Sequence, residues 1–143
     1  MPDPTLSYEA WVASRGPGLT RDVIWRSVDY RRALYCVYLG WDDVRCLSRT
    51  GVTRDVASQL IRALGSVPAN FAEGYSRSSG LDRAKHFEYS LGSDRESVVW
   101  YEAAIPILGQ HLVSDRQERL QEVMRSLLAM IPRERRRSIR AQS

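Results

Sequence analysis

Histidine and cysteine are scarce in this sequence, and glycine-rich loops are missing. Its 143 residues include two histidines and two cysteines. A di-iron helical bundle needs Glu-x-x-His pairs on two helices, but Arg83 and Leu108 stand three residues before His86 and His111. No phosphate-binding glycine pattern or zinc spacing occurs in the chain. We therefore expect no metal site, no cofactor and no catalysis.

The two cysteines do not predict a disulfide. Cys36 and Cys46 fall in one expected helix, where ten residues span roughly 15 Å, which is too far for an S–S bond. Buried thiols suit a reducing compartment. Because Met1-Pro2-Asp3-Pro4 is no cationic leader and no apolar run is long enough to span a membrane, we expect a cytoplasmic protein with no membrane partner.

Lysine is nearly absent, and the positive charge is concentrated at one end. Of the 21 cationic residues, 20 are arginine, and the formal net charge is +4. Residues 132–143 hold five arginines and one glutamate, so residues 1–131 sum to zero. Arginine favours phosphate contacts, although a GC-rich genome would produce the same bias.

Apolar residues recur with helical spacing, and no stretch alternates with period two. At this length we expect one domain. Residues 1–19 predict an arm in which Tyr8, Trp11 and Val12 share one face of a short helix that ends at Gly16-Pro17-Gly18. We expect these aromatics to dock on the domain; the alternative is an exchange contact with a neighbouring subunit.

Four longer helices are predicted within residues 20–131. The first, residues 20–47, has a heptad seam of Tyr30, Leu34, Val37, Trp41 and Val44. The second follows the N-cap candidate Thr53, is kinked by Pro68, and carries Val56, Leu60, Ala63, Leu64, Val67 and Phe71.

The third and fourth helices begin at capping boxes. The third begins at Ser79-Gly80-Leu81-Asp82, has one polar gap at Asp94 and should kink or end at Pro106. The fourth begins at Ser114-Asp115-Arg116-Gln117 and carries Leu120, Val123, Leu127 and Ile131. The prediction is an all-α, antiparallel up-down four-helix bundle with a short N-terminal arm.

Two helices carry a second apolar stripe opposite the first. A monomeric surface helix needs only one, so we expect self-association, with aromatic residues at the subunit interface. The expected interface residues are Ile24, Val28, Tyr35 and Leu39 on the first helix, and Tyr89, Trp100 and Ile107 on the third.

Two groups of polar residues were considered as sites. Asp82, His86 and Ser90 follow the order of a catalytic triad along one helix, but no oxyanion hole is evident, and a solvated face explains them. The second group surrounds Pro68 and predicts either a network that satisfies freed backbone groups or a ligand or partner site. It consists of Gln59, Arg62, Asn70, Glu73 and Arg77.

The C-terminal segment, residues 132–143, predicts electrostatic attraction to phosphate. Its basic residues are Arg133, Arg135, Arg136, Arg137 and Arg140. A solvated, disordered terminus is the alternative for a single chain. On an assembly, several such segments would act multivalently.

The segment 59–77, QLIRALGSVPANFAEGYSR, resembles the signature of the 23S ribosomal RNA intervening-sequence proteins. Phe87, the run Leu91-Gly92-Ser93 and Glu96 are similar to that family's third helix, and Ile24-Trp25-Arg26 to the start of its first. The resemblance implies a four-helix bundle that forms a ring, typically a homopentamer. It also implies kinship with the basic accessory protein of diversity-generating retroelements, and it carries no catalytic residues.

These observations favour a non-enzymatic, ring-forming binding or scaffold module, with RNA or DNA as partners of the basic segments. The alternative is a structural or protein-interaction ring without nucleic-acid binding. The neutral charge of residues 1–131 leaves only the C-terminal segment for polyanions.

Overall fold

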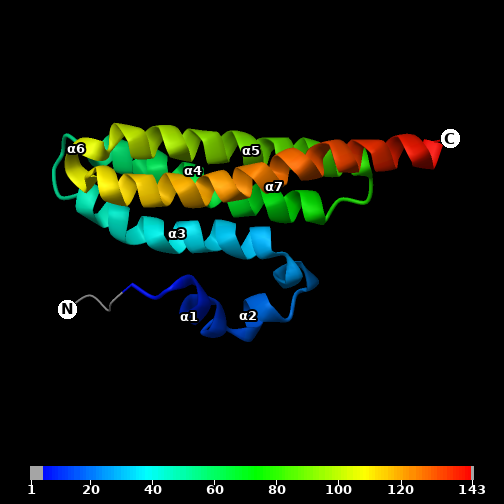
Figure 1. Ribbon diagram of the computed structural model, residues 1–143, viewed down its shortest axis with the longest axis horizontal. Coiled ribbons are helices and arrows are strands. Elements are labelled where there is room, and N and C mark those ends of the chain that lie inside the picture. The colour runs from blue at the N-terminus through cyan, green and yellow to red at the C-terminus, as the bar shows by residue number, and fades with distance from the viewer. Residues whose placement is uncertain (1–4, 143) are drawn as a thin grey trace.

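Four long helices form an antiparallel up-down bundle, and a smaller helical layer lies against one of them (Figure 1). A computed structural model describes residues 5–142, with side chains described as far as residue 137. The bundle helices are α3 (Val28–Leu47), α4 (Arg54–Tyr75), α5 (Gly80–Ala103) and α7 (Gln110–Gln142). The predicted all-α bundle is therefore confirmed.

The first bundle helix begins later than predicted. Residues 20–27 do not continue α3; they include the end of α2 (Pro17–Thr20) and the 3-10 helix η1 (Val23–Arg26). Ser27 is extended, and its hydroxyl accepts a hydrogen bond from the Tyr30 N–H at 3.3 Å. Asp22 caps η1 in the same way through the Ile24 N–H at 3.1 Å. These two N-caps divide the segment that the apolar spacing predicted as one helix over residues 20–47.

Helices α4 and α5 have nearly the predicted bounds. Thr53 precedes α4, but its hydroxyl donates to the Leu47 carbonyl at the end of α3 and caps no N–H of α4. The Ser79 side chain accepts from the Asp82 N–H at 3.2 Å, as the capping box predicted. Helix α4 continues through Pro68 as one element.

The last helix begins before its predicted cap. Helix α5 ends at Ala103, and Pro106 lies in the first turn of the short helix α6 (Ile105–Leu108). Gly109 then adopts a φ of 86° and permits a sharp turn directly into α7 at Gln110. Ser114 is thus already within α7, where its hydroxyl oxygen accepts from the Gln110 side-chain amide at 2.9 Å. The second predicted capping box is wrong.

The bundle core consists of two apolar clusters placed end to end. One is centred on Phe71, Phe87 and Leu127, and the other on Leu60, Tyr101 and Leu120. Helix α5 also has three fully buried polar residues: Asp94 and Ser97 lie at sequence positions between the parts of α5 that belong to each cluster, and Ser90 lies next to Leu91 of the first cluster. The core residues predicted for α4 and α7 are buried or partly buried, but the seam predicted for α3 is wrong at two positions: Trp41 is 54% exposed, and Leu34 packs against an apolar cluster outside the bundle.

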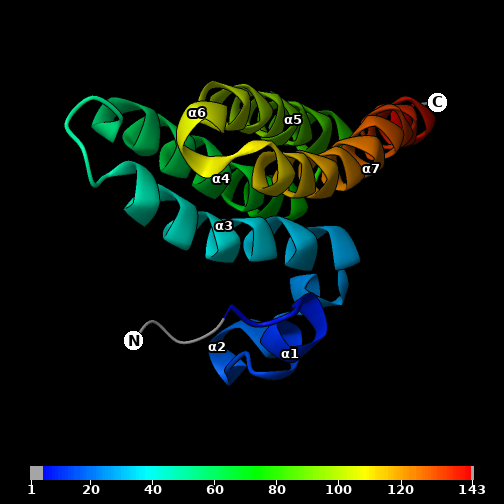
Figure 2. The same ribbon diagram turned by 60° about the vertical axis from the view of Figure 1, so that its left-hand side comes forward.

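A third apolar cluster lies outside the bundle. The arm folds into α1 (Tyr8–Ala13) and α2, and both lie on the outer side of α3 (Figure 2). Trp11 is buried there with Trp25, Tyr35 and Leu39. This confirms the expectation that the arm aromatics dock on the domain.

Candidate functional site

The arginine-rich end of the chain is a continuation of α7 (Figure 1). The helix runs through Pro132 to Gln142, where we expected either a phosphate-binding or a disordered terminus. Arg133, Arg135, Arg136 and Arg137 are exposed on it. The side chain of Arg140 lies outside the described residues.

Part of this positive charge is already paired. Arg135 forms an ion pair with Glu88 of α5, and Arg137 contacts Glu134 at 3.1 Å. Arg133 and Arg136 have no carboxylate within ion-pair distance among the residues whose side chains are described. These two arginines therefore carry the charge that is most available to an external anion.

Arg83 joins three helices beside this segment and was missed by the sequence analysis. Its Nε donates to the Arg77 carbonyl at 2.7 Å, beyond the end of α4, and its guanidinium approaches Glu134 of α7 at 3.9 Å. Periodicity gave no signal for these contacts, because one crosses the turn between α4 and α5 and the other joins residues 83 and 134.

The polar residues around Pro68 form a solvent-facing stripe on α4. Their side-chain bonds are local: Asn70 donates to the Ser66 carbonyl at 2.9 Å, and Arg77 pairs with Glu73 at 2.8 Å. Gln59 and Arg62 are exposed. Within the described part of the chain, their side chains form no hydrogen bond or ion pair with a neighbouring helix, so the predicted network is not formed there. The stripe remains open as a binding surface.

The helix contact next to Pro68 comes from Ser90. This residue is fully buried, and its hydroxyl donates to the Val67 carbonyl at 2.7 Å. Ser90 is thus occupied in a structural bond between α4 and α5, while Asp82 is exposed and His86 packs edge-on against Tyr89. The three residues do not form a triad, and the solvated face expected for them is wrong at Ser90, which faces the interior of the bundle.

The expected interface residues divide into three groups. Ile24 belongs to the bundle core, and Tyr35 and Leu39 are buried under the arm of the same chain. These three are not available to a second subunit while the arm is docked. Val28, Tyr89 and Ile107 are exposed, and Trp100 is half-buried. The second stripe of α3 therefore has an explanation within one chain, whereas that of α5 does not.

A buried ionic network connects α3, α5 and α7. The Asp43 carboxylate accepts from the Tyr101 hydroxyl at 2.7 Å and from two nitrogens of Arg116 at 2.8 and 3.2 Å. Arg116 also contacts Asp115 at 2.7 Å, and Asp115 pairs with Arg119 at 3.1 Å. No local pattern in the sequence indicates this network, because Asp43 and Arg116 are 73 positions apart.

The pKa shifts in this network follow from burial and charge. Burial raises the pKa of Tyr101, and the Asp43 charge and hydrogen bond raise it further. Burial alone would lower the pKa of Arg116, but the hydrogen bond and charge of Asp43, together with Tyr101 and the hydrogen bond to Asp115, outweigh this and the pKa is raised. Burial opposes ionisation of Asp115, yet its bonds to Arg119 and Arg116 lower its pKa. The network is therefore ionic and structural, with no group poised for proton transfer at neutral pH.

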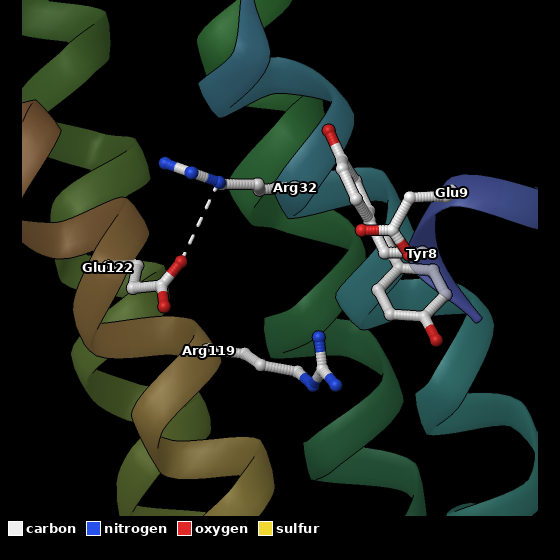
Figure 3. A pocket seen from close by; sticks show the side chains of 6 residues that line it. Tyr8, Glu9, Arg32, Arg119 and Glu122 are labelled. Carbon is white, nitrogen blue, oxygen red and sulfur yellow. Dashed lines mark ion pairs between the residues drawn. The ribbon is translucent and has the colours of Figure 1, made fainter. Parts of the chain in front are cut away.

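One pocket of about 230 Å³ lies between the arm and the bundle. Figure 3 shows Tyr8 and Glu9 of α1 facing Arg32 of α3 and Arg119 and Glu122 of α7. Arg32 approaches Glu122 at 3.6 Å, and the Arg119 guanidinium lies 5.2 Å from the centre of the Tyr35 ring. Both arginines of the pocket thus already contact groups of the chain.

Cys36 is buried and Cys46 is partly buried; both are free thiols. Burial raises the pKa of Cys36 to about 12, so this thiol is not nucleophilic. Among the described residues, no group of three or more His, Cys, Asp and Glu side chains could hold a metal ion. No helix in the described part of the chain is long and apolar enough to cross a membrane.

Comparison with known proteins identifies the family. The family model described as "23S rRNA-intervening sequence protein" matches residues 48–133, which is more than half of the chain. The chain belongs to the 23S rRNA-intervening sequence protein family. The resemblance noted in the segment 59–77 is thereby confirmed.

A solved structure has the same fold as this intervening-sequence protein. It is a Bacteroides thetaiotaomicron protein of unknown function from the S23 ribosomal protein family, with a TM-score of 0.68 and 18% identity. The match covers 98% of that chain but 73% of this one, so the protein has about a quarter of its length beyond the shared part. No curated protein matches the chain.

Proposed function

We propose that the protein is a non-enzymatic, self-associating helical module that binds RNA or DNA through the arginine-rich end of α7. The observation that carries the proposal is the course of α7, which continues as one helix past Ile131 and holds Arg133 and Arg136 exposed. A helical segment fixes the spacing of its charges, so less conformational entropy is lost on binding than for a free tail.

The family description supports a nucleic-acid partner because it refers to ribosomal RNA. Residues 1–131 carry no net charge, so the end of α7 provides the electrostatic attraction. Two arginines make a weak site on one chain. Several copies in one assembly would present several such ends, and their combined affinity would exceed that of each alone.

The test is a titration of fluorescent RNA and DNA with the full chain at about 50 and 200 mM salt, a range over which phosphate contacts weaken strongly. The variant Arg133→Gln/Arg136→Gln keeps the helix length and removes two charges. We expect it to bind several-fold more weakly at low salt and to lower the salt slope by about 1.4 on a single strand, if both arginines contact phosphate.

The matched control is Arg49→Gln/Arg54→Gln. These two arginines are exposed around the α3–α4 turn, at the opposite end of the bundle from the C-terminus (Figure 1). The control loses the same net charge, so equal weakening in both variants would indicate a general charge effect and contradict the proposed site. Unchanged binding of the α7 variant would contradict it as well.

A second candidate is a protein-interaction ring without nucleic-acid binding. The exposed apolar residues Tyr89 and Val99 on α5 and Ile107 on α6 favour it, because no element of the described chain covers them. A protein that self-associates but binds neither RNA nor DNA at low salt would support this alternative.

A further inference from the structure

The outer side of α3 is built to hold a short peptide segment. We define the slot as Trp25, Tyr35, Tyr38 and Leu39. Trp11 of the arm is only 3% exposed in it, with its ring centre 5.6 Å from that of Tyr35 and 6.0 Å from that of Tyr38. Burying a tryptophan among aromatic rings is a typical anchor of peptide and protein recognition.

The slot also binds the backbone of the segment. The Leu6 N–H donates to the Tyr38 hydroxyl at 2.9 Å, and the Tyr35 hydroxyl donates to the Leu6 carbonyl at 2.7 Å. Two tyrosines thus satisfy both peptide groups of one residue. The Thr5 hydroxyl adds a bond to Asp42 at 3.3 Å. Two features therefore define the segment that the slot accepts. One residue forms hydrogen bonds to both tyrosines through its backbone N–H and carbonyl, which we call the clamp, and an aromatic anchor follows five residues later.

The arm can leave the slot without opening the bundle core. The cluster around Trp11 is separate from the two core clusters, and partly buried Tyr30 packs against both it and the cluster around Phe71. Figures 1 and 2 show the arm as a layer on α3, away from α4 and α5. Release of the arm therefore breaks the contacts between the arm and α3 but leaves the packing of the bundle core in place.

The connection from the arm to the bundle is short and mostly exposed. Residues 14–22 contain Gly16-Pro17-Gly18, and added Cβ atoms at Gly16 and Gly18 would meet nothing within 4 Å. A segment that detaches at an exposed connection can fill the same slot on a second copy with the same contacts, which makes exchange between identical chains a low-cost route to association.

We propose that in the assembled protein the slot on α3 is filled by the arm of a second copy. The proposal rests on the self-association proposed above. Within an assembly the neighbouring slot has a high effective concentration, so the exchange preserves each Trp11 anchor and each Leu6 clamp while linking two chains. The pocket between the arm and α7 would then be lined by residues of two copies.

The test mixes two defective full-length chains. Trp11→Ala has a defective arm and an intact slot; Tyr35→Phe/Tyr38→Phe has an intact arm and a slot without its clamping hydroxyls. Docking holds α1 folded against α3 with Trp11 only 3% exposed, and a protease needs a locally unfolded segment, so the rate of tryptic cleavage after Arg15 reports release of the arm. Intact mass spectrometry follows each chain separately. Alone, each variant should be cleaved about tenfold faster than the natural chain, because an anchor or two hydrogen bonds are lost.

The outcome of mixing decides between docking within a chain and docking between chains. Exchange predicts that the Tyr35→Phe/Tyr38→Phe chain regains near-natural protection in the mixture, since its intact arm can enter the intact slot of the Trp11→Ala chain. The Trp11→Ala chain should stay sensitive. Tyr75→Phe, which removes a hydroxyl outside the slot, is the matched control and should be cleaved like the natural chain.

Native mass spectrometry of the same mixture separates the two proposals. Mixed assemblies in which both chains remain sensitive would overturn the arm exchange and leave self-association intact. A chain that is monomeric at all concentrations would overturn both. Circular dichroism melts of each variant establish that the bundle is folded in every sample.

Discussion

At the residue scale, Asp94 is the most unusual group in the core. It is 0% exposed, and neither carboxylate oxygen has a hydrogen-bond partner among the described residues. Burial raises its pKa from 3.8 to about 8, and nearby Arg95 only partly opposes this. At neutral pH the folded protein therefore holds Asp94 mainly as the neutral acid, because an unpaired buried carboxylate would be costly.

This arrangement predicts a stability that falls as the pH rises. The raised pKa means that the folded protein binds a proton that the unfolded chain releases above about pH 4. The contribution of protonated Asp94 to the free energy of unfolding is fully present below the pKa of this residue in the unfolded chain. It is lost as the pH rises toward 8, by about 1.4 kcal/mol per pH unit at most. Urea unfolding at pH 5, 6, 7 and 8 measures the slope.

In Asp94→Asn the side chain is neutral at every pH, so the slope of unfolding free energy against pH should flatten. The stability of the variant relative to the natural protein should therefore increase as the pH rises. Glu118→Gln removes an exposed carboxylate of α7 and should leave the slope unchanged. Parallel curves for the natural chain and Asp94→Asn would show that Asp94 does not titrate in this range.

At the element scale, α4 and α5 are in close contact at Gly74. A Cβ there would lie 2.8 Å from the Phe87 ring and 3.1 Å from the Arg83 carbonyl oxygen, and neither group is the free end of a flexible chain. Gly74→Ala should therefore destabilise the bundle by about 1–3 kcal/mol through overpacking.

Gly92 on α5 is the matched control. A Cβ at this position meets nothing within 4 Å, so Gly92→Ala should stabilise the protein by about 0.5–1 kcal/mol through helix propensity alone. Thermal unfolding of both variants provides the comparison. An equal gain in both would mean that α4 and α5 are not in close contact at Gly74.

The elements themselves were largely predictable from the sequence, whereas some of their limits were not. Heptad spacing located α4, which is amphipathic, and also α5, which keeps one apolar seam although it buries three polar residues and exposes Tyr89 and Val99; polar turns bound both helices. The break at Ser27 was missed, since the apolar spacing continues across it, and the start of α7 was misplaced, since the backbone freedom of Gly109 outweighed the capping box at Ser114.

Residues that depend on the tertiary fold could not be predicted in the same way. Tyr35 was assigned to a subunit interface because apolar spacing cannot tell which chain covers a stripe; here the arm does. Trp41 continues the heptad seam but lies where no helix covers it. Asp43 and Arg116 meet only once α3 and α7 are packed, so neither residue stood out in the sequence.

At the scale of the whole molecule, α3 and α5 differ in whether their second apolar stripe is covered. The arm of the same chain or of a second chain covers the stripe on α3. The outer side of α5 still exposes Tyr89 at 49% and Val99 at 62%. Tyr89 and Val99 are ten positions apart, about 15 Å along the helix, so an interaction surface on α5 would have to extend over both of them.

If copies associate through α5, a charge at Val99, close to the C-terminal end of this helix, should separate them. Val99→Glu would place an unpaired carboxylate in the contact and remove apolar burial, which together should weaken association by at least about tenfold. Val52→Glu, on the exposed α3–α4 turn, is the matched control. Light scattering should give a multiple of 16.3 kDa for the natural chain and the control, and a lower mass for Val99→Glu at the same concentration. An assembly that survives Val99→Glu would exclude this side of α5 and direct the search for the subunit contact to the arm and α3.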